Sequence, residues 1–352
     1  MSLAALLGTE LPLIQAPMAG AQGSALAIAA CRAGALGSLP AAMLSPQALR
    51  DELAAIRAAT DRPFNVNFFC HRPPIADAAV EARWRAALAP FCGEHGIDPS
   101  TIPAGPGRRP FDEEAAAIVE TVRPRVVSFH FGLPPPALLQ RVKALGALVL
   151  SSATTVAEAR WLAGHGADVV VAQGLEAGGH RGHFLCDELT VQSGLFALLP
   201  QVVRAVDVPV VAAGGIADAR GVAAAMALGA AGVQVGTAFL CTTEATTGPL
   251  HRQALLAADA PPTALTNLFT GRPARGLVNR LMRELGPLSD LAPAFPLATA
   301  AIAPLRAAAE AAGRSDFTPL WCGQNRSGCR EVAAGEIVRD LARGFGATRR
   351  QP

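Results

Sequence analysis

The sequence predicts an α/β fold, a closed (β/α)8 TIM barrel, and three observations point to it. Eight short apolar runs alternate along the chain with Ala- and Leu-rich stretches of helical spacing, the pattern of repeated strand–helix units. Some of these runs, such as 208–213, are almost continuous Val and Ala, as in strands that are buried on both faces. The length of 352 residues also accommodates a barrel, which commonly needs about 250 residues in one domain.

Each expected strand is an apolar run that ends in small or polar residues. The eight runs are 13–18, 35–39, 64–69, 126–131, 148–152, 168–173, 208–213 and 232–239. Each run is followed by a stretch with helical periodicity. The eight expected helices are 24–32, 46–59, 113–122, 135–145, 156–163, 193–206, 219–228 and 244–257. Eight strands, each with a following helix, favour a closed barrel over an open sheet.

Two segments exceed what a barrel needs. The first, 70–112, follows the third strand and contains one expected helix at 77–88. The second, 261–352, carries two helical patterns, 300–312 and 329–344. Long segments near a barrel mouth often form lids or substrate walls, and peripheral packing is the alternative. We therefore expect a barrel over 1–260 and a smaller, mostly helical lid or substrate region built from the insertion and the C-terminal extension.

Composition and charge exclude several classes of protein. Hydrophobic residues make up 51% of the chain and charged residues 16%, which indicates a large buried core rather than disorder. The net charge is +2 and the arginines are scattered, so we expect no nucleic-acid partner. The uncharged run 221–243 is long enough to cross a membrane, but glycines interrupt it. A helix, a turn and a buried strand explain this run better than a membrane span.

The seven cysteines are widely spaced and show no paired metal-ligand pattern, so we expect no metal site. An odd number of unpaired cysteines and a start without a basic, signal-like segment favour the cytoplasm. Cys322 and Cys329 are either a redox pair or two incidental thiols of the core, and the second interpretation is favoured.

In a barrel of this kind the chemistry lies where the strands end. The seventh expected strand ends in Gly214 and Gly215. The eighth contains the sequence Gln234, Val235, Gly236, Thr237. Glycines allow backbone N–H groups to surround a phosphate, Thr237 adds a hydroxyl, and the loops after strands seven and eight are the recurrent phosphate site of this fold. Tight packing turns without a ligand are the alternative.

The end of the sixth strand combines glycines with histidines. Gln173 is followed by Gly178, Gly179, His180 and, three residues later, His183. Adjacent glycines allow the main chain to lie against a flat ligand such as a flavin ring. Imidazole titrates near neutrality, so His180 is the candidate base beside that ring. His183 either binds substrate or orients the loop.

Three further strand ends carry candidate residues. Pro17 and Met18, at the end of the first strand, are expected to face one side of the flavin. Asn65 and Asn67 share a face of the third strand, and Asn67 is nearer the barrel mouth, so it is chosen as the partner of the polar flavin edge. His130, at the end of the fourth strand, is either a donor to an anionic substrate or a structural histidine. Two other polar features have simpler explanations. Thr154 or Thr155 caps the next helix. The basic group Arg272, Arg275, Arg280 and Arg283 either attracts an anionic substrate or a pyridine nucleotide or forms a solvated helical face, and the solvated face is favoured.

Taken together, seven motifs resemble those of the nitronate monooxygenases, formerly called 2-nitropropane dioxygenases. They lie at 14–18, 64–69, 128–134, 172–182, 213–216, 234–237 and 321–324. The resemblance implies FMN bound by the residues at Asn67, Gln173, Gly178, Gly215 and 234–237, with His180 as the catalytic residue. It also implies the reaction, in which an alkyl nitronate passes an electron to FMN, O2 is engaged, and a carbonyl compound and nitrite leave.

The resemblance leaves the substrate and the electron donor open. Some members line the pocket with tyrosines and a lysine from the C-terminal region, whereas this chain has no tyrosine and its one lysine is Lys143. Residues of the tail such as Phe295 are alternative lining residues. An alternative function is NAD(P)H-dependent reduction of a quinone or an enoyl thioester, and a non-catalytic FMN- or phosphate-binding protein is a second. A homodimer is compatible with each of these functions.

Overall fold

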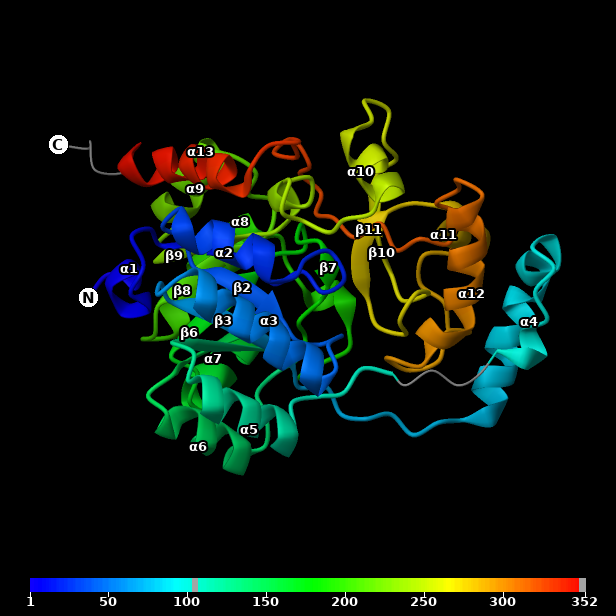
Figure 1. Ribbon diagram of the computed structural model, residues 1–352, viewed down its shortest axis with the longest axis horizontal. Coiled ribbons are helices and arrows are strands. Elements are labelled where there is room, and N and C mark those ends of the chain that lie inside the picture. Colours follow the sequence, from blue (N-terminus) through cyan, green and yellow to red (C-terminus); the bar gives the residue numbers. More distant parts are fainter. Residues whose placement is uncertain (103–106, 348–352) are drawn as a thin grey trace.

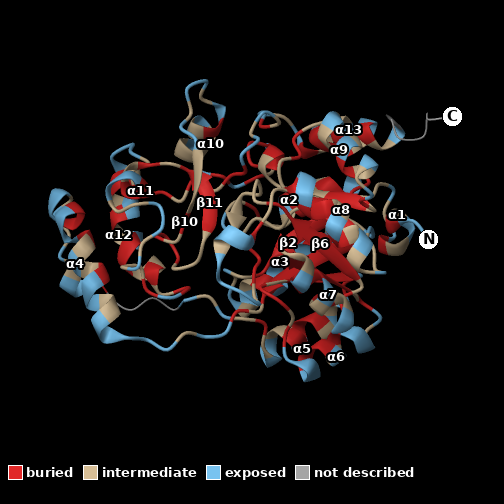
Figure 2. Cartoon of the chain, turned by 180° about the vertical axis from the view of Figure 1, so that it is seen from behind, coloured by how far each residue is buried: buried red, intermediate tan, exposed pale blue. Residues whose placement is uncertain are grey.

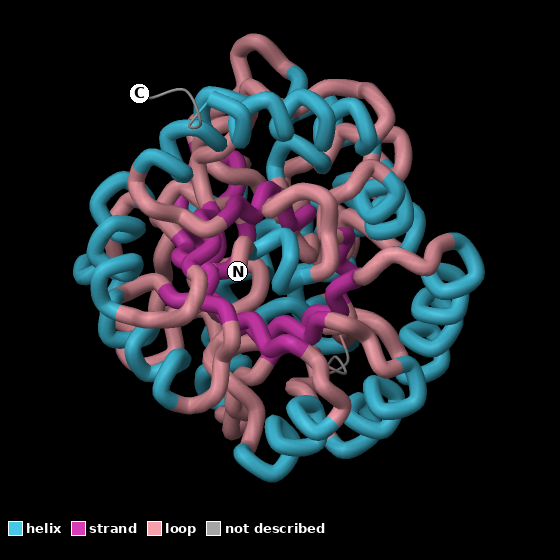
Figure 3. The backbone as a smooth tube through the Cα atoms, turned by 90° about the vertical axis from the view of Figure 1, so that its left-hand side faces the viewer, coloured by secondary structure: helices cyan, strands magenta, loops and turns pink. Residues whose placement is uncertain are grey.

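The computed structural model describes residues 1–102 and 107–347, and its larger part is the predicted barrel (Figures 1 and 3). Eight parallel strands are hydrogen-bonded in the order β1-β9-β8-β6-β5-β4-β3-β2. A parallel bridge between Ile14 and Leu36 joins β1 to β2 and closes the ring. The strands are β1 (Leu13–Gln15), β2 (Gly37–Pro40), β3 (Phe64–Phe69), β4 (Val126–His130), β5 (Leu148–Ala153), β6 (Val169–Gln173), β8 (Val210–Ala213) and β9 (Gly232–Val235). Each lies within one residue of, or inside, an expected strand, except β2, which begins and ends slightly later.

Helices surround the strands, and buried positions gather on the strands and on the inner faces of those helices (Figure 2). They are α2 (Ser24–Arg32), α3 (Pro46–Ala59), α5 (Glu113–Val122), α6 (Pro136–Ala144), α7 (Val156–Gly164), α8 (Leu195–Ala205) and α9 (Ala219–Ala227). Side-chain caps begin several of them: Ser45 starts α3, Asp112 starts α5 and Thr155 starts α7. Of the two threonines expected to cap this helix, Thr154 and Thr155, Thr155 is the one that does so. A short helix, α1 (Leu3–Leu7), inserts Leu3 and Leu7 among the residues that fill the barrel.

The eighth helix of the barrel is not the one expected from the sequence. The segment expected at 244–257 forms only α10 (Pro249–Leu256), which projects from the barrel (Figure 1). Its place is taken by α13 (Ala334–Ala347), which packs against α9 and α2 and buries Ile337, Val338 and Leu341 in the main core. The predicted division at residue 260 is therefore wrong for this helix. The last segment of the tail returns to the barrel because its apolar stripe completes the ring of helices.

The remaining segments form a second region with a core of its own. The insertion contributes α4 (Ala78–Glu94) and a 3-10 helix (Pro99–Thr101), and the tail contributes α11 (Arg280–Glu284) and α12 (Ala298–Ala311). Trp84 of α4 is buried against α12 and donates its indole N–H to the carbonyl of Ala298 (3.3 Å). Figure 1 shows α4 beside α12, although α4 precedes β4 in the chain. Residues 103–106 of the insertion lie outside the described residues.

The second region is less helical than expected, since it contains a three-stranded antiparallel sheet. Its strands are β10 (Thr263–Thr266), β11 (Ala274–Leu277) and β7 (Gly179–His180), in the order β10-β11-β7. Ala274 pairs with His180, and Arg275 pairs with Gly179. The loop after β6 is thereby fixed to the second region. A search of the described helices finds no candidate membrane span, and 221–243 contains most of α9, all of β9 and a 3-10 helix.

Candidate active site

A cavity of about 500 Å³ lies at the carboxyl ends of the barrel strands, between the barrel and the second region. The structure brings almost every predicted site residue to its wall. The predicted residues that line it are Pro17, Met18, Asn67, His130, Gln173, Gly178, Gly179, His180, Gly214, Gly215, Gln234, Val235, Gly236 and Thr237. His183 is the exception, because its ring is buried in the loop after β7 and does not line the cavity.

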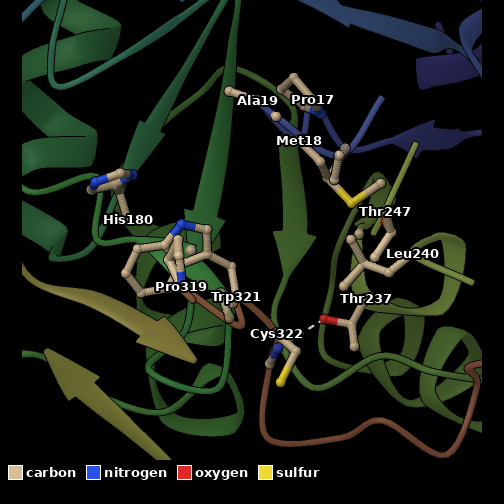
Figure 4. A pocket seen from close by; sticks show the side chains of 18 of the residues that line it. Pro17, Met18, Ala19, His180, Thr237, Leu240, Thr247, Pro319, Trp321 and Cys322 are labelled. Carbon is tan, nitrogen blue, oxygen red and sulfur yellow. Dashed lines mark hydrogen bonds between the residues drawn. The ribbon is translucent and has the colours of Figure 1, made fainter. Parts of the chain in front are cut away.

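One end of the cavity has the features of a phosphate site. Gly214 and Gly215 follow β8 with φ values of +116° and +71°, conformations that only glycine adopts without strain. Gly236 and Thr237 follow β9, the strand that pairs with β8. The N–H of Gly323 donates to the Thr237 hydroxyl oxygen (2.8 Å), so the hydroxyl proton stays available to a ligand (Figure 4). A Cβ on Gly236 would lie 3.3 Å from the Cβ of Ala16, and one on Gly215 would lie 3.5 Å from the Cβ of Glu176, so both glycines also pack against neighbouring side chains.

The two glycines before His180 serve different purposes. A Cβ on Gly178 would lie 2.4 Å from the backbone carbon of Cys322 and 2.5 Å from the nitrogen of Gly323. Gly178 is therefore required by close packing against 322–323, whereas the sequence suggested close approach to a flat ligand. Gly179 has φ +70° and no atom within 4 Å of an added Cβ. Only Gly179 leaves room for such a ligand.

Asn67 and Gln173 use their amides differently. Asn67 donates from Nδ2 to the hydroxyl of Ser128 (2.9 Å), which leaves its Oδ1 without a described partner on the cavity wall. Asn65 points into the barrel and does not line the cavity, in line with the choice of Asn67. The Gln173 amide donates to the carbonyl of His180 (3.0 Å) and accepts from the N–H of Gly182 (2.8 Å). Gln173 therefore holds the histidine loop in place.

His180 is held from the side of the second region. Its Nε2 lies 2.9 Å from the hydroxyl oxygen of Thr270, and no described residue is bonded to its Nδ1. Thr270 also contacts the carbonyl of Arg272 (3.3 Å). When the threonine proton is directed to that carbonyl, Nε2–H donates to Thr270 and Nδ1 keeps its lone pair. Trp321, 5.8 Å away between ring centroids, lies between His180 and Cys322 in Figure 4.

The histidines near the cavity are neutral at physiological pH. Burial, followed by the charges of Arg108, His130, Arg272 and His71, places the pKa of His180 well below its ordinary value. Burial lowers the pKa of His130 to about 4. His130 donates from Nε2 to the carbonyl of His180 (3.2 Å) and accepts from the Ser152 hydroxyl (3.0 Å). Neither histidine therefore carries a positive charge toward an anionic substrate, and the hydrogen bonds of His130 favour its interpretation as a structural histidine.

The basic group of the tail is not a solvated helical face. Arg275 is 7% exposed, lies in β11, and donates to the carbonyl of Leu175 (2.7 Å). Arg272 stacks 4.2 Å from the ring centroid of Phe131. Arg280 and Arg283 belong to α11, where Arg280 pairs with Glu94 and Glu284 and Arg283 is exposed. The expected face fails because a strand and a turn separate Arg272 and Arg275 from α11.

The cysteines Cys322 and Cys329 are buried in one apolar cluster with Cys241. Burial raises the pKa of Cys322 to about 12, so its thiol stays protonated. Cys329 contacts the carbonyl of Thr237 through its sulfur (3.2 Å). These contacts favour the interpretation as core thiols.

Several lining residues were not chosen from the sequence. They are Met43, Phe69, Arg108, His251, Trp321, Cys322, Gly323 and Asn325, and Thr270 acts behind His180. The 321–324 segment carried a signal, because it was among the motifs, but nothing local linked it to the barrel mouth. Phe295 does not line the cavity itself but packs 5.3 Å from the His180 ring. Among the described residues, no group of His, Cys, Asp and Glu side chains is arranged to hold a metal.

Burial of neutral histidines makes stability depend on pH. The pKa of His183 is lowered to about 3 and that of His251 to about 4, mainly by burial. Below pH 6.5 the unfolded chain therefore binds protons that the folded chain does not, and the free energy of unfolding decreases as pH falls. We expect Tm to fall between pH 7 and pH 5, and His183→Gln to reduce that fall. A wild-type Tm that is constant over this range would contradict the interpretation.

Comparison with known proteins agrees with this site. A family model described as nitronate monooxygenase matches residues 1–344. A nitronate monooxygenase of Paraburkholderia phytofirmans is 42% identical over 345 residues, which cover 97% of this chain and 94% of the relative. One of Pseudomonas aeruginosa is 42% identical and covers 96% of each chain. The chain belongs to the nitronate monooxygenase family. It is thus an oxidoreductase, and the fold predicted from its sequence is confirmed.

Solved structures of related proteins share this barrel fold over almost the whole length of the chain. The structure of a nitroalkane oxidase from Streptomyces ansochromogenes matches with a TM-score of 0.90 at 39% identity, over 99% of each chain. FabK from Thermotoga maritima matches with a TM-score of 0.74 at 28% identity, over 99% of this chain and 97% of that one. The nitroalkane oxidase likeness is the stronger of the two in both measures.

Proposed function

We propose that this enzyme oxidises alkyl nitronates, and nitroalkanes, with O2 to carbonyl compounds and nitrite, using FMN. The observation that carries the proposal is a single cavity that joins a phosphate-type cradle at β8 and β9 to a neutral histidine, His180. Similarity to the nitronate monooxygenases and to the nitroalkane oxidase supports the reaction. The family is one of flavoenzymes, and FMN is the flavin that such a cradle suits, since it carries one terminal phosphate.

The residues present fit an FMN molecule. The 214–215 and 236–237 backbones and the Thr237 hydroxyl would hold the phosphate. The unpartnered Oδ1 of Asn67 would accept from the polar edge of the ring, and Pro17 and Met18 would cover one of its faces. Bound FMN supplies the centre that takes electrons from the substrate and meets O2. The protein supplies orientation and excludes water.

His180 gives the site a way to use neutral nitroalkanes. Its lowered pKa keeps the imidazole unprotonated at physiological pH. The unpartnered Nδ1 accepts a proton from the carbon next to the nitro group, and the substrate becomes a nitronate. A nitronate that arrives already deprotonated does not need this step. The second region provides Trp321 to the wall and Thr270 as the partner behind His180, which supports its assignment as a substrate wall.

All seven cysteines are free thiols, which supports a reducing compartment such as the cytoplasm. Small molecules are the expected partners, and a homodimer stays a prediction.

An anaerobic titration of the FMN-loaded enzyme tests the proposal. Ethylnitronate should bleach the flavin absorbance within seconds, and NADH or NADPH should bleach it at least about tenfold more slowly. Rapid bleaching by NAD(P)H together with none by nitronate would instead favour a reductase of quinones or enoyl thioesters, the function suggested by the weaker FabK likeness. A protein that neither copurifies with FMN nor binds added FMN would contradict every flavin hypothesis, including a non-catalytic FMN-binding role.

A further inference from the structure

The charged residues on the cavity wall differ in how they are paired. Among the described residues, those that line the cavity are Arg108, Glu176, Arg306 and Glu310. The carboxylate of Glu176 accepts from the N–H of Leu195 at the start of α8 (2.8 Å). Arg306 and Glu310 pair with each other (2.7 Å). Within the described chain, Glu176 has no opposite charge within 4.0 Å, but backbone N–H donation compensates its carboxylate. Among the described residues, Arg108 is therefore the one lining cation that has no opposite charge within 4.0 Å.

The side chain of Arg108 is half-buried, and its backbone is anchored at the barrel mouth. Its backbone carbonyl accepts from Nε2 of the buried His71 (2.9 Å), which anchors this part of the insertion to the barrel mouth. The guanidinium lies 5.5 Å from the centroid of Phe295 and donates from Nη1 to the hydroxyl of Thr299 (3.4 Å). Phe295 in turn packs against the His180 ring. One long hydrogen bond leaves most of its five N–H donors unused.

The surroundings of His180 are electropositive. Arg108 is the charge that depresses the pKa of His180 most, and Arg272 also contributes. No carboxylate is among the groups that act on this histidine. Arg272 stacks on Phe131, bonds to the carbonyl of His183 and does not line the cavity, so it is not free to meet a ligand. A half-buried cation without a counter-ion is costly unless an anion binds there.

We propose that Arg108 is a substrate-binding residue that selects anions whose two oxygens share one negative charge. The inference rests on the proposed function and specifies its substrate class. A nitronate carries two oxygens on one nitrogen, in the planar arrangement that a guanidinium binds through two parallel hydrogen bonds. Because His130 and His180 are neutral, Arg108 supplies the positive charge that the site needs for such a substrate. A neutral nitroalkane gains less from the same contact.

The test uses Arg108→Gln in the FMN-loaded enzyme, with Arg109→Gln as the matched control. Arg109 is the next residue, is 62% exposed, and pairs with Asp112, so its variant removes the same charge at the surface. For ethylnitronate we expect kcat/KM of Arg108→Gln to fall about 10- to 100-fold, the range of charge-assisted hydrogen bonds. For nitroethane we expect a fall of about threefold or less, and little change for either substrate in the control. Arg108→Lys keeps the positive charge but lacks the planar guanidinium that donates two parallel hydrogen bonds. Its kcat/KM for ethylnitronate should lie between those of the wild type and Arg108→Gln.

Nitrate provides a readout that needs no turnover, since it is planar, anionic and unreactive here. Its apparent Kd, from the rise of Tm with nitrate over matched chloride, should increase about tenfold or more in Arg108→Gln and stay unchanged in Arg109→Gln. Equal losses on nitronate and nitroethane, with nitrate binding retained, would overturn the proposal. If the wild type bound nitrate through Arg108 but did not oxidise nitronate, the proposed function would fail while the anion site stood.

Discussion

His180→Asn is expected to lower turnover of a neutral nitroalkane by about 10²- to 10⁴-fold, the usual contribution of a positioned general base. Asparagine places an amide near the position of Nδ1 but has no basic nitrogen, and it is too short to keep the Nε2 contact to Thr270. Turnover of a preformed nitronate should fall much less, because no proton is removed from it. Stopped-flow reduction of the enzyme-bound flavin by nitroethane and by ethylnitronate measures the two effects separately.

His183→Asn is the matched control for this variant. His183 lies three residues later in the same loop and is 2% exposed, but it does not line the cavity. Its turnover with nitroethane should stay within about threefold of the wild type, and both variants should retain FMN. If His180→Asn oxidised nitroethane at the wild-type rate, His180 would not be the base. If the two variants lost activity equally, loop structure rather than proton transfer would explain the loss.

The dependence on pH follows from the direction of the His180 shift. An ordinary histidine base would lose half of its unprotonated form at pH 6.5. Because the pKa of His180 is well below that value, the base form persists as pH falls through 6.5. The activity of the wild type with nitroethane should therefore show no loss from this group between pH 8 and pH 6.

The parts of this site that the sequence predicted are local in the chain. Gly214, Gly215, Gly236 and Thr237 directly follow strands whose apolar pattern is evident, and the barrel rule places such strand ends together. His180 likewise follows β6 within a few residues. For these residues, the spacing to a recognisable strand was sufficient.

The parts that the sequence missed depend on contacts between distant segments. Thr270 meets His180 across 90 positions, and Cys322 limits Gly178 across 144 positions, so no local pattern records either contact. The sequence also did not show that α13, and not the segment 244–257, forms the eighth helix around the barrel, because that choice depends on a contact between distant segments. Both 244–257 and the end of the chain have apolar residues at helical spacing, and periodicity does not say which surface a helix covers.

Arg181 explains how the histidine loop stays in place, and its loss should have the largest effect on stability. It is fully buried, with 0% exposure. Its guanidinium donates to the carbonyls of Gln173 (2.8 Å) and Gly174 (2.7 Å) and to Oε1 of Gln192 (2.8 Å). These bonds join the end of β6 to the loop that follows His180. The buried guanidinium is stabilised by these three hydrogen bonds and forms no ion pair with a carboxylate of the described residues within 4.0 Å.

Arg181→Met should lower the free energy of unfolding by about 3–5 kcal/mol, because it removes three buried hydrogen bonds donated by one charged group, and of the three acceptors the carbonyl of Gly174 keeps a bond from the N–H of Ala177. The loop would also loosen, so FMN should dissociate more readily than from the wild type. Urea unfolding followed by circular dichroism measures the first effect, and FMN release during dialysis the second. Arg204→Met, at an exposed position of α8, is the control and should change stability by about 0.5 kcal/mol or less. A loss of under about 1 kcal/mol in Arg181→Met would mean that Gln173, through its bonds to His180 and Gly182, holds the loop without the arginine.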